Sequence, residues 1–309
     1  MDMDAVRVQN LRKTYGDVAV VDDVSFTIAR GETFALLGPN GAGKSTTVEI
    51  LEGYRRRTGG SVSVLGADPG TAGLDWKARI GIVLQSAGQG GLYTVREQLR
   101  QFATYYPRAR DVDEVIAAVG LEAQAGTRIA KLSGGQQRRV DVALGIIGRP
   151  ELLFLDEPTT GFDPQARREF WQLIRGLQDE GTTILLTTHY LDEAAQLADR
   201  VAVITRGRLR AIGPVAGFGG EKARTPRVTW FEHAVMHEAR TDRPWEFTAA
   251  LAARLGGEPE GLEIRRPALE EIYLEMVDEQ DGRDAAGDVT VRGAEDDAPQ
   301  TPATEGAGQ

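Results

Sequence analysis

A short apolar run, a glycine-rich loop and a helical pattern follow one another near the N-terminus, and this stretch constrains the fold most strongly. The run TFALL, residues 33–37, is typical of a buried strand, and KSTTVEILEGY, residues 44–54, is typical of a helix. The loop GPNGAGKST, Gly38 to Thr46, satisfies the pattern G-x-x-x-x-G-K-[ST] between a strand and a helix, which is the context that the pattern requires. Glycines let backbone N–H groups curl around phosphate oxygens. The sequence therefore predicts a phosphate-binding loop on an α/β fold.

Within this loop the residue types have separate tasks. Lys44 would place a cation against the β- and γ-phosphates of a nucleotide, and Ser45 would offer its hydroxyl to Mg²⁺. The residues expected to bind the nucleotide are Gly38, Pro39, Asn40, Gly41, Ala42, Gly43, Lys44, Ser45 and Thr46.

Polar side chains also end three other predicted strands. Asp156 and Glu157 follow the apolar run ELLFL, His189 follows TTILLTT, and Gln85 ends ARIGIVLQ. Because ligands gather at the carboxyl ends of parallel strands, we expect these side chains to face the phosphates. Asp156 would hold Mg²⁺ through its water shell, and Glu157 would polarise the attacking water. His189 could donate a hydrogen bond to the γ-phosphate, and Gln85 could reach the metal or the water.

A second glycine-rich helix start, LSGGQ, lies downstream of the loop. Ser133 is predicted to cap a helix, with Gln136 at the reciprocal position of a capping box, so that the helix N-terminus forms a second anion site. The loop at Gly38 already saturates the phosphates on its own side. The second site therefore suggests a phosphate held by another molecule. Two chains arranged head to tail would bury two nucleotides, each between the Lys44 loop of one chain and the Ser133 helix of the other.

The order of patterns predicts the domain organisation. Alternating strands and helices argue for a parallel sheet. We expect a nucleotide-binding domain over residues 1–215, with a helical part at about 86–150. Residues 216–276 would form a small accessory region, in the order strand, helix, strand, helix. Residues 277–309 are acidic, lack apolar periodicity and are predicted to be disordered.

Composition excludes several other classes of protein. The chain of 309 residues has no cysteine, which rules out a disulfide partner and a thiolate metal site. The net charge of −10 makes direct binding of nucleic acid a poor expectation. No apolar run approaches the length of a membrane span. His233 and His237 have the spacing of a metal site on a helix, but no third ligand is evident and a strand is predicted nearby, so we predict no metal there.

Taken together, these motifs resemble the ATP-binding subunit of ABC transporters, from about Val6 to Gly213. Tyr15 is similar to the aromatic residue that stacks on adenine in that family, and the loop at Gly38 is similar to the Walker A motif. The segment from Leu152 to Asp156 resembles the Walker B motif, with Glu157 as the catalytic glutamate.

The remaining elements of the resemblance lie in loops and helix starts. Gln85 corresponds to the Q-loop, Asp163 to the D-loop and His189 to the switch histidine, and Phe162 replaces the leucine that is commoner beside the D-loop aspartate. The family signature, which would contact the ATP of a second copy, is Leu132, Ser133, Gly134, Gly135 and Gln136.

This resemblance implies a P-loop NTPase core with a parallel sheet, an N-terminal antiparallel β subdomain, an inserted helical signature subdomain and a small C-terminal α+β appendix. It also implies an ATPase that uses ATP and Mg²⁺ and dimerises with a second copy. A separately encoded integral membrane permease would hold it at the cytoplasmic, inner face of the bacterial cell membrane. LEGYRRRTGGSVSVLGADP and RRPALEEIYLEM resemble the drug- and polymer-export subfamily typified by daunorubicin-resistance ATPases.

Other functions within this superfamily remain open at this point. Only the subfamily resemblance favours an exporter ATPase over an importer ATPase. A non-transport ATPase that regulates a protein or nucleic-acid partner is also possible. Chromosome-organising ATPases insert long coiled coils between the two motifs, and the short spacing from Lys44 to Ser133 excludes them. Ribosome-associated relatives carry two cassettes in one chain, whereas this chain has one.

Overall fold

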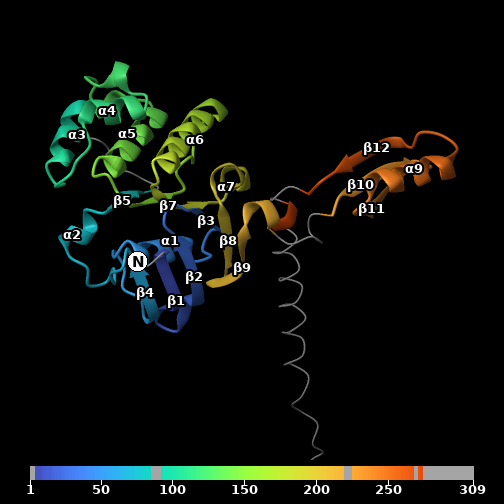
Figure 1. The fold of residues 1–309 in the computed structure, drawn as a ribbon, viewed down its shortest axis with the longest axis horizontal. Coiled ribbons are helices and arrows are strands. Elements are labelled where there is room, and N and C mark those ends of the chain that lie inside the picture. The colour runs from blue at the N-terminus through green and yellow to red at the C-terminus, as the bar shows by residue number, and fades with distance from the viewer. Residues whose placement is uncertain (1–3, 85–91, 219–224, 268–270, 274–309) are drawn as a thin grey trace, which may run out of the picture.

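The computed structural model describes residues 4–84, 92–218, 225–267 and 271–273, and within them it contains three β-sheets. Figure 1 shows a larger body that holds two of the sheets and a small C-terminal lobe that stands to one side of it. The expected disordered tail and Gln85 both lie outside the described residues.

A six-stranded sheet with the order β5-β6-β7-β3-β8-β9 forms the centre of the body. Its strands are β3 (Thr33–Leu37), β5 (Ile80–Val83), β6 (Leu152–Asp156), β7 (Thr183–Thr188), β8 (Arg200–Thr205) and β9 (Arg208–Pro214). Neighbours from β5 to β8 are parallel, whereas β9 is antiparallel to β8. Every residue of β3 and β7 is buried, and a strand covered on both faces reads as a largely apolar run rather than as an alternation. The predicted α/β fold class is confirmed.

A second, antiparallel sheet covers one side of this core. Its order is β2-β1-β4, and its strands are β1 (Asp4–Tyr15), β2 (Val18–Ala29) and β4 (Gly59–Val64). Phe26 of β2 stacks on Phe34 of β3 with ring centroids 5.2 Å apart, so that the two sheets share one apolar cluster. This contact fixes the antiparallel sheet against the strand that leads into the glycine loop.

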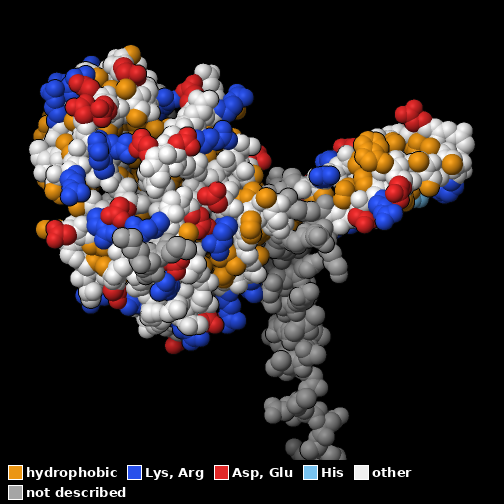
Figure 2. All heavy atoms as spheres, in the orientation of Figure 1, with side chains coloured by type: hydrophobic (Ala, Val, Ile, Leu, Met, Phe, Trp, Pro, Cys, Tyr) orange, Lys and Arg blue, Asp and Glu red, His pale blue; other side chains and the backbone are white. Residues whose placement is uncertain are grey.

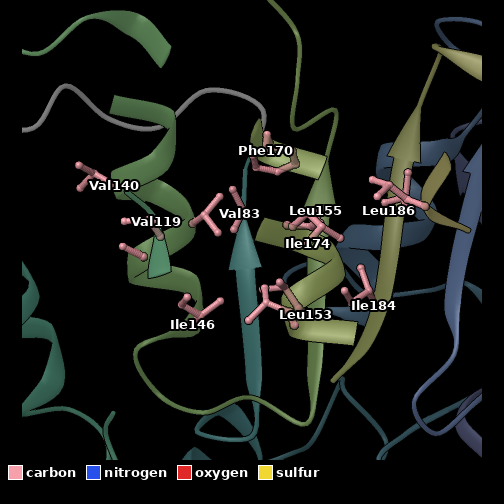
Figure 3. Close-up of a cluster of buried hydrophobic side chains, with 14 of the residues drawn as sticks. Val83, Val119, Val140, Ile146, Leu153, Leu155, Phe170, Ile174, Ile184 and Leu186 are labelled. Atoms are coloured by element: carbon pink, nitrogen blue, oxygen red, sulfur yellow. The ribbon is translucent and has the colours of Figure 1, made fainter. Parts of the chain in front are cut away.

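Helices lie on both sides of the central sheet. The first two share the apolar cluster of the antiparallel sheet through Val48, Leu51 and Trp76, whereas the later ones cover the opposite side and form a separate group beyond β5 (Figure 1). The helices are α1 (Lys44–Leu51), α2 (Leu74–Lys77), α3 (Val95–Ala103), α4 (Val112–Ala118), α5 (Gly134–Ile146), α6 (Pro164–Asp179) and α7 (Leu191–Leu197), with 3-10 turns at Glu122–Gln124, Ile129–Lys131 and Val215–Gly217. Figure 3 shows Ile146 of α5 and Phe170 of α6 facing the same cluster as Val83 and Leu153 of the sheet. The helix that starts at LSGGQ therefore packs on the central sheet through a continuous apolar core.

The C-terminal lobe has its own small core. It consists of β10 (Arg227–Glu232), β11 (Val235–Arg240), α9 (Pro244–Leu255) and β12 (Glu260–Arg265), with the strand order β11-β10-β12. Val228, Trp230 and Leu251 form the buried centre of this core. The α+β class of the appendix is confirmed.

The order of elements in this lobe was predicted incorrectly, because a second strand precedes the helix. Strand β11 reads VMHEAR, in which apolar and polar residues do not alternate, and it forms because β10 pairs with it in continuous register from Arg227 to Glu232. The turn between them places His233 and Ala234 at positive φ, at 54° and 62°, without the Asn-Gly pair that usually signals such a hairpin. Most of the expected second helix lies outside the described residues.

The surface carries both signs of charge. Figure 2 shows Lys and Arg side chains interspersed with Asp and Glu over the visible face of the body, and apolar side chains on the lobe. Val235, Met236 and Trp245 are the large apolar side chains that the lobe exposes most. Within the described ranges, the helices all lack the combination of length and apolar character that a bilayer span needs.

Candidate functional site

The glycine loop joins β3 to α1, and no side chain of the described residues caps the helix N-terminus by a hydrogen bond. Gly43, the cap residue, has φ 101°, which only glycine adopts readily. A Cβ atom at Gly38 would lie 2.2 Å from the carbonyl oxygen of Ile204, so no larger residue fits there. The loop therefore presents free backbone N–H groups at the positive end of a helix, which is an anion site.

Lys44 closes this loop from inside. Its Nζ donates to the carbonyl oxygens of Gly38 at 2.8 Å and Pro39 at 3.2 Å, and its side chain is only 5% exposed. Burial lowers the pKa of Lys44, while the charges of Glu157 and Asp156 act in the opposite direction. The ammonium group is thus held at the base of the loop, where phosphate charge would be neutralised.

Three of the residues predicted to act in catalysis converge here. Glu157 Oε1 lies 3.9 Å from Lys44 Nζ and 3.4 Å from His189 Nδ1. Glu157 has φ 43°, a conformation that side-chain-bearing residues rarely adopt and that often marks functional sites. Its N–H donates to the carbonyl oxygen of Thr187 at 3.1 Å. The ends of β6 and β7 therefore set the direction of the glutamate.

Asp156 ends β6 beside these groups and suits the predicted Mg²⁺. The hydroxyl of Thr187 donates to Asp156 Oδ1, which leaves Oδ2 for another partner. Ser45 lies exposed in the first turn of α1. The Ser45 hydroxyl and the Asp156 carboxylate both supply the oxygen ligands that Mg²⁺ prefers. Among the described residues no cluster of three or more His, Asp or Glu side chains could enclose a metal. The donor set therefore fits a cation held by few protein ligands together with phosphates and waters.

The second anion site lies on the exposed end of α5. The N–H of Gln136 donates to Ser133 Oγ at 3.3 Å, and the N–H of Ser133 donates to Gln136 Oε1 at 3.0 Å. The predicted capping box is therefore present. Cβ atoms at Gly134 and Gly135 would meet nothing within 4 Å, so packing inside the chain does not require these glycines. Of the hydrogen bonds and ion pairs found among the described residues, none joins this helix start to the Lys44 loop.

Two further predicted residues have visible surroundings. Tyr15, at the end of β1, is 44% exposed, and Lys13 Nζ lies 4.8 Å from its ring centroid while Arg55 donates to its hydroxyl. Asp163 caps α6 by accepting from the N–H groups of Gln165 at 2.9 Å and Ala166 at 2.8 Å. The adenine-stacking role of Tyr15 and the D-loop role of Asp163 stay predictions.

The histidine pair of the lobe does not resemble a metal site. His233 lies in the β10–β11 turn and His237 lies on β11, where its ring stacks on Trp230 at 5.4 Å. The expectation of no metal at this pair stays a prediction. The helical spacing that would have aligned the two rings is not present.

Sequence reasoning overlooked residues whose side chains support the site from behind. Thr187 orients Asp156, and its signal was a hydroxyl side chain near the carboxyl end of the buried strand TILLTT. Arg138 is 7% exposed and binds three carbonyl oxygens at the ends of β5 and β6. An arginine on a helix is ordinarily a surface residue, so nothing in the sequence around Arg138 indicated that its side chain is buried.

Comparison with known proteins relates this chain to one family. A profile described as "ABC transporter" matches residues 21–160. The Nod factor export ATP-binding protein I of Rhizobium johnstonii is 46% identical over 215 residues, which cover 68% of this chain and 69% of that protein. The protein of the same name from Sinorhizobium fredii is 46% identical over 210 residues, covering 66% of this chain and 61% of that protein.

Solved structures give the same relationship at the level of the fold. The ATP-binding subunit of an ABC transporter superimposes with a TM-score of 0.66 at 24% identity, covering 88% of this chain and 99% of that one. A dimeric ATP-binding cassette in a post-hydrolysis state, bound to ADP and Pi, superimposes with a TM-score of 0.61 at 26% identity, covering 69% of this chain and all of that one at 100%.

Proposed function

Because the chain belongs to the ABC transporter family and is an ATP-hydrolysing subunit, we propose that it powers export through a separate membrane permease. The observation that carries the chemistry is the convergence of Lys44, Glu157 and His189 at the carboxyl edge of the central sheet. The export direction is supported by the similarity to export ATP-binding proteins over two thirds of the chain. We propose a drug-like, hydrophobic or polymeric cargo that the permease selects.

Each residue of the site has a part in the proposed hydrolysis. The loop at Gly38 binds the phosphates through backbone N–H groups, and Lys44 neutralises charge on the β- and γ-phosphates. Glu157 orients the attacking water and takes up its proton as the bond from the γ-phosphorus to the bridging oxygen breaks. His189, 3.4 Å from Glu157, donates to the γ-phosphate and holds the glutamate in line. Mg²⁺, held by Ser45, Asp156 and Gln85, would supply further neutralisation of phosphate charge.

We further propose that two copies complete each other's sites. The exposed capping box of Ser133 and the open space around Gly134 and Gly135 leave the N-terminus of α5 accessible to a phosphate of another copy. The similarity to a dimeric ATP-binding cassette supports this arrangement. Each nucleotide would then lie between one chain's Lys44 loop and the other chain's α5.

The permease would dock near the segment that contains Gln85. Leu84, Leu92 and Tyr93, the described residues that flank this segment, expose 54%, 82% and 50% of their surfaces. Large apolar side chains that stay exposed on either side of one segment suit a protein interface. Through this contact the chain would lie peripherally at the inner face of the bacterial cell membrane.

The first experiment tests the two-copy site by light scattering with Mg-ATP. In Glu157→Gln we expect hydrolysis to fall by at least about 100-fold, because the general base is lost. We also expect the variant to accumulate as a dimer, because ATP is bound and not consumed. Adding Ser133→Ala should weaken this dimer by about tenfold or more, because the anion site loses its cap.

Thr94→Ala in the Glu157→Gln background is the matched control. Thr94 and Glu97 form a second capping box at the start of α3, so this change removes an equivalent cap from a helix that is not expected to touch nucleotide. The control should leave dimerisation intact. A Glu157→Gln chain that stays monomeric at saturating Mg-ATP would contradict the proposal that two of these chains dimerise on ATP by themselves.

A further inference from the structure

Arg138 lies on the second turn of α5, two residues after the capping box, and its side chain points into the body. Its exposed fraction is 7%, although an arginine is rarely buried without partners. Its Nε donates to the carbonyl oxygen of Pro158 at 3.0 Å, one terminal nitrogen donates to the carbonyl oxygen of Leu84, and the other donates to that of Asp156 at 3.0 Å. All three nitrogens of the guanidinium group therefore bind backbone.

These three carbonyl groups have one feature in common, which is their position beside proposed catalytic residues. Leu84 directly precedes Gln85 in the chain, and Pro158 directly follows Glu157. The third carbonyl belongs to Asp156 itself. One side chain of α5 thus holds the ends of β5 and β6 at the points where they leave the sheet.

The neighbouring arginine, Arg139, points elsewhere, so the direction of the Arg138 side chain is not common to both. Arg139 donates to the carbonyl oxygen of Val119 and pairs with Glu169, so it ties α5 to the segment after α4 and to α6. Arg138 alone of these two reaches the catalytic edge of the sheet. Its charge is balanced at that position by Asp141, whose Oδ2 lies 3.7 Å from an Arg138 nitrogen.

We propose that Arg138 is a positioning residue, which couples the Ser133 anion site of α5 to the Asp156–Glu157 segment of the same chain. When nucleotide binding moves that segment, the three hydrogen bonds from Arg138 to carbonyl oxygens transmit the movement to α5. This is the helix whose N-terminus would contact the nucleotide of the partner copy. The nucleotide bound to one chain thereby affects how well the Ser133 anion site of that chain binds the nucleotide of the other chain. The inference rests on the proposed two-copy arrangement and adds a route between the two sites.

The chemistry of arginine makes the proposal testable. A planar guanidinium group can donate in several fixed directions at once, whereas a lysine ammonium group is a compact charge on a flexible stem. Arg138→Lys keeps the charge but cannot span three carbonyl oxygens, and Arg138→Gln removes the charge. Both variants should therefore lose the coupling, even where the lysine variant folds as well as the unmodified chain.

The experiment compares ATP binding with the ATP dependence of hydrolysis in the full-length chain. The affinity of each variant for a fluorescent ATP analogue, measured at concentrations that keep it monomeric, should stay within about twofold of the unmodified chain. The kcat should fall by about tenfold, and the Hill coefficient for ATP should fall from about two toward about one. Thermal melts identify any variant that fails to fold, and the lysine variant then carries the test.

Arg200→Lys is the matched control. Arg200, at the start of β8, also donates to a backbone carbonyl oxygen, that of Thr27, and it pairs with Glu32. The control should leave both kcat and the Hill coefficient unchanged. A folded Arg138→Lys or Arg138→Gln variant with unaltered cooperativity would overturn the inference, whether or not kcat falls, because a purely structural role predicts that result. An unmodified chain with a Hill coefficient of about one would remove the two-site arrangement itself, and the inference with it.

Discussion

At the scale of single residues, the site depends on acidic groups in unequal surroundings. Glu157 lies beside the basic groups of Lys44 and His189. Glu52, at the end of α1, is only 7% exposed, and no positive charge is among the groups that shift its pKa. Burial raises the pKa of Glu52 to about 7, and the negative charges of Asp156 and Glu49 act in the same direction. The fold therefore tolerates Glu52 best in its protonated form.

This pKa predicts how Glu52→Gln changes stability with pH. A raised pKa means that the folded state binds the proton more tightly than the unfolded state, whose ordinary value is 4.5. The contribution of Glu52 is thus fully present below pH 4.5 and is lost as the pH rises toward about 7. Compared with the unmodified chain, Glu52→Gln should therefore gain more free energy of unfolding at pH 8 than at pH 5. The difference between the two gains should be on the order of 1–3 kcal/mol.

Thermal melts of the nucleotide-free chain at the two pH values would measure this difference. The exposed Glu258→Gln serves as the control and should give the same change in Tm at both. If Glu52→Gln also shifts Tm equally at both pH values, Glu52 is not the buried titrating group described above.

At the scale of elements, α5 combines a weak start with a strong anchor. Glycine destabilises a helix relative to alanine, and α5 has two glycines in its first turn. The capping box and the buried side chains of Val140, Val142, Ala143 and Ile146 compensate for them. Because a Cβ atom at Gly135 would meet nothing within 4 Å, the glycine is not required by contacts within the chain.

Gly135→Ala should therefore separate stability from function. We expect the variant to be more stable by about 0.5 to 1 kcal/mol, because alanine restricts the unfolded chain and favours the helix. We expect ATP hydrolysis to fall by about tenfold or more, because the added methyl group would stand where a phosphate of the second copy approaches. Denaturant unfolding and steady-state ATPase rates measure the two effects.

Gly176→Ala is the matched control for this prediction. Gly176 lies in α6, and a Cβ atom there would also meet nothing within 4 Å. It should gain similar stability and keep full activity. Equal activity in both variants would argue that nothing approaches the N-terminus of α5 during turnover.

At the scale of the whole molecule, the C-terminal lobe is joined to the body on both sides. The chain leaves the body after Phe218, builds the lobe and returns at Ile272. Both residues belong to the core cluster that also holds α5 and α6, and Ile272 is 1% exposed. The lobe itself stands away from the body in Figure 1. The ATPase body is thus completed by residues that follow the lobe in sequence.

Ile272→Ala should destabilise the body although it lies in the C-terminal part of the chain. Truncating a fully buried isoleucine typically costs about 2–5 kcal/mol. We expect the unfolding transition that Mg-ATP stabilises to move to a lower temperature. Ile264→Ala, in the separate cluster of the lobe, should leave that transition in place. Calorimetry with and without Mg-ATP distinguishes the two, and an unmoved transition in Ile272→Ala would show that the body folds without this segment.

Local patterns were enough to predict much of this protein. The glycine loop, the buried strands β3, β6 and β7 and the capping box at Ser133 all depend on residues within one or two turns of each other, so the sequence determined them. The positions of Asp156, Glu157 and His189 at strand ends also followed, because parallel strands bring their carboxyl ends to one edge.

Only the tertiary structure decided the features that depend on distant partners. Strand β11 lacks the alternation of apolar and polar residues that would identify it alone, and it forms by pairing with β10. The direction of Arg138, the burial of Glu52 and the return of Ile272 to the body are set by neighbours far along the chain. A polar side chain acquires its role from the groups that replace water around it, and the sequence specifies those groups only through the complete fold.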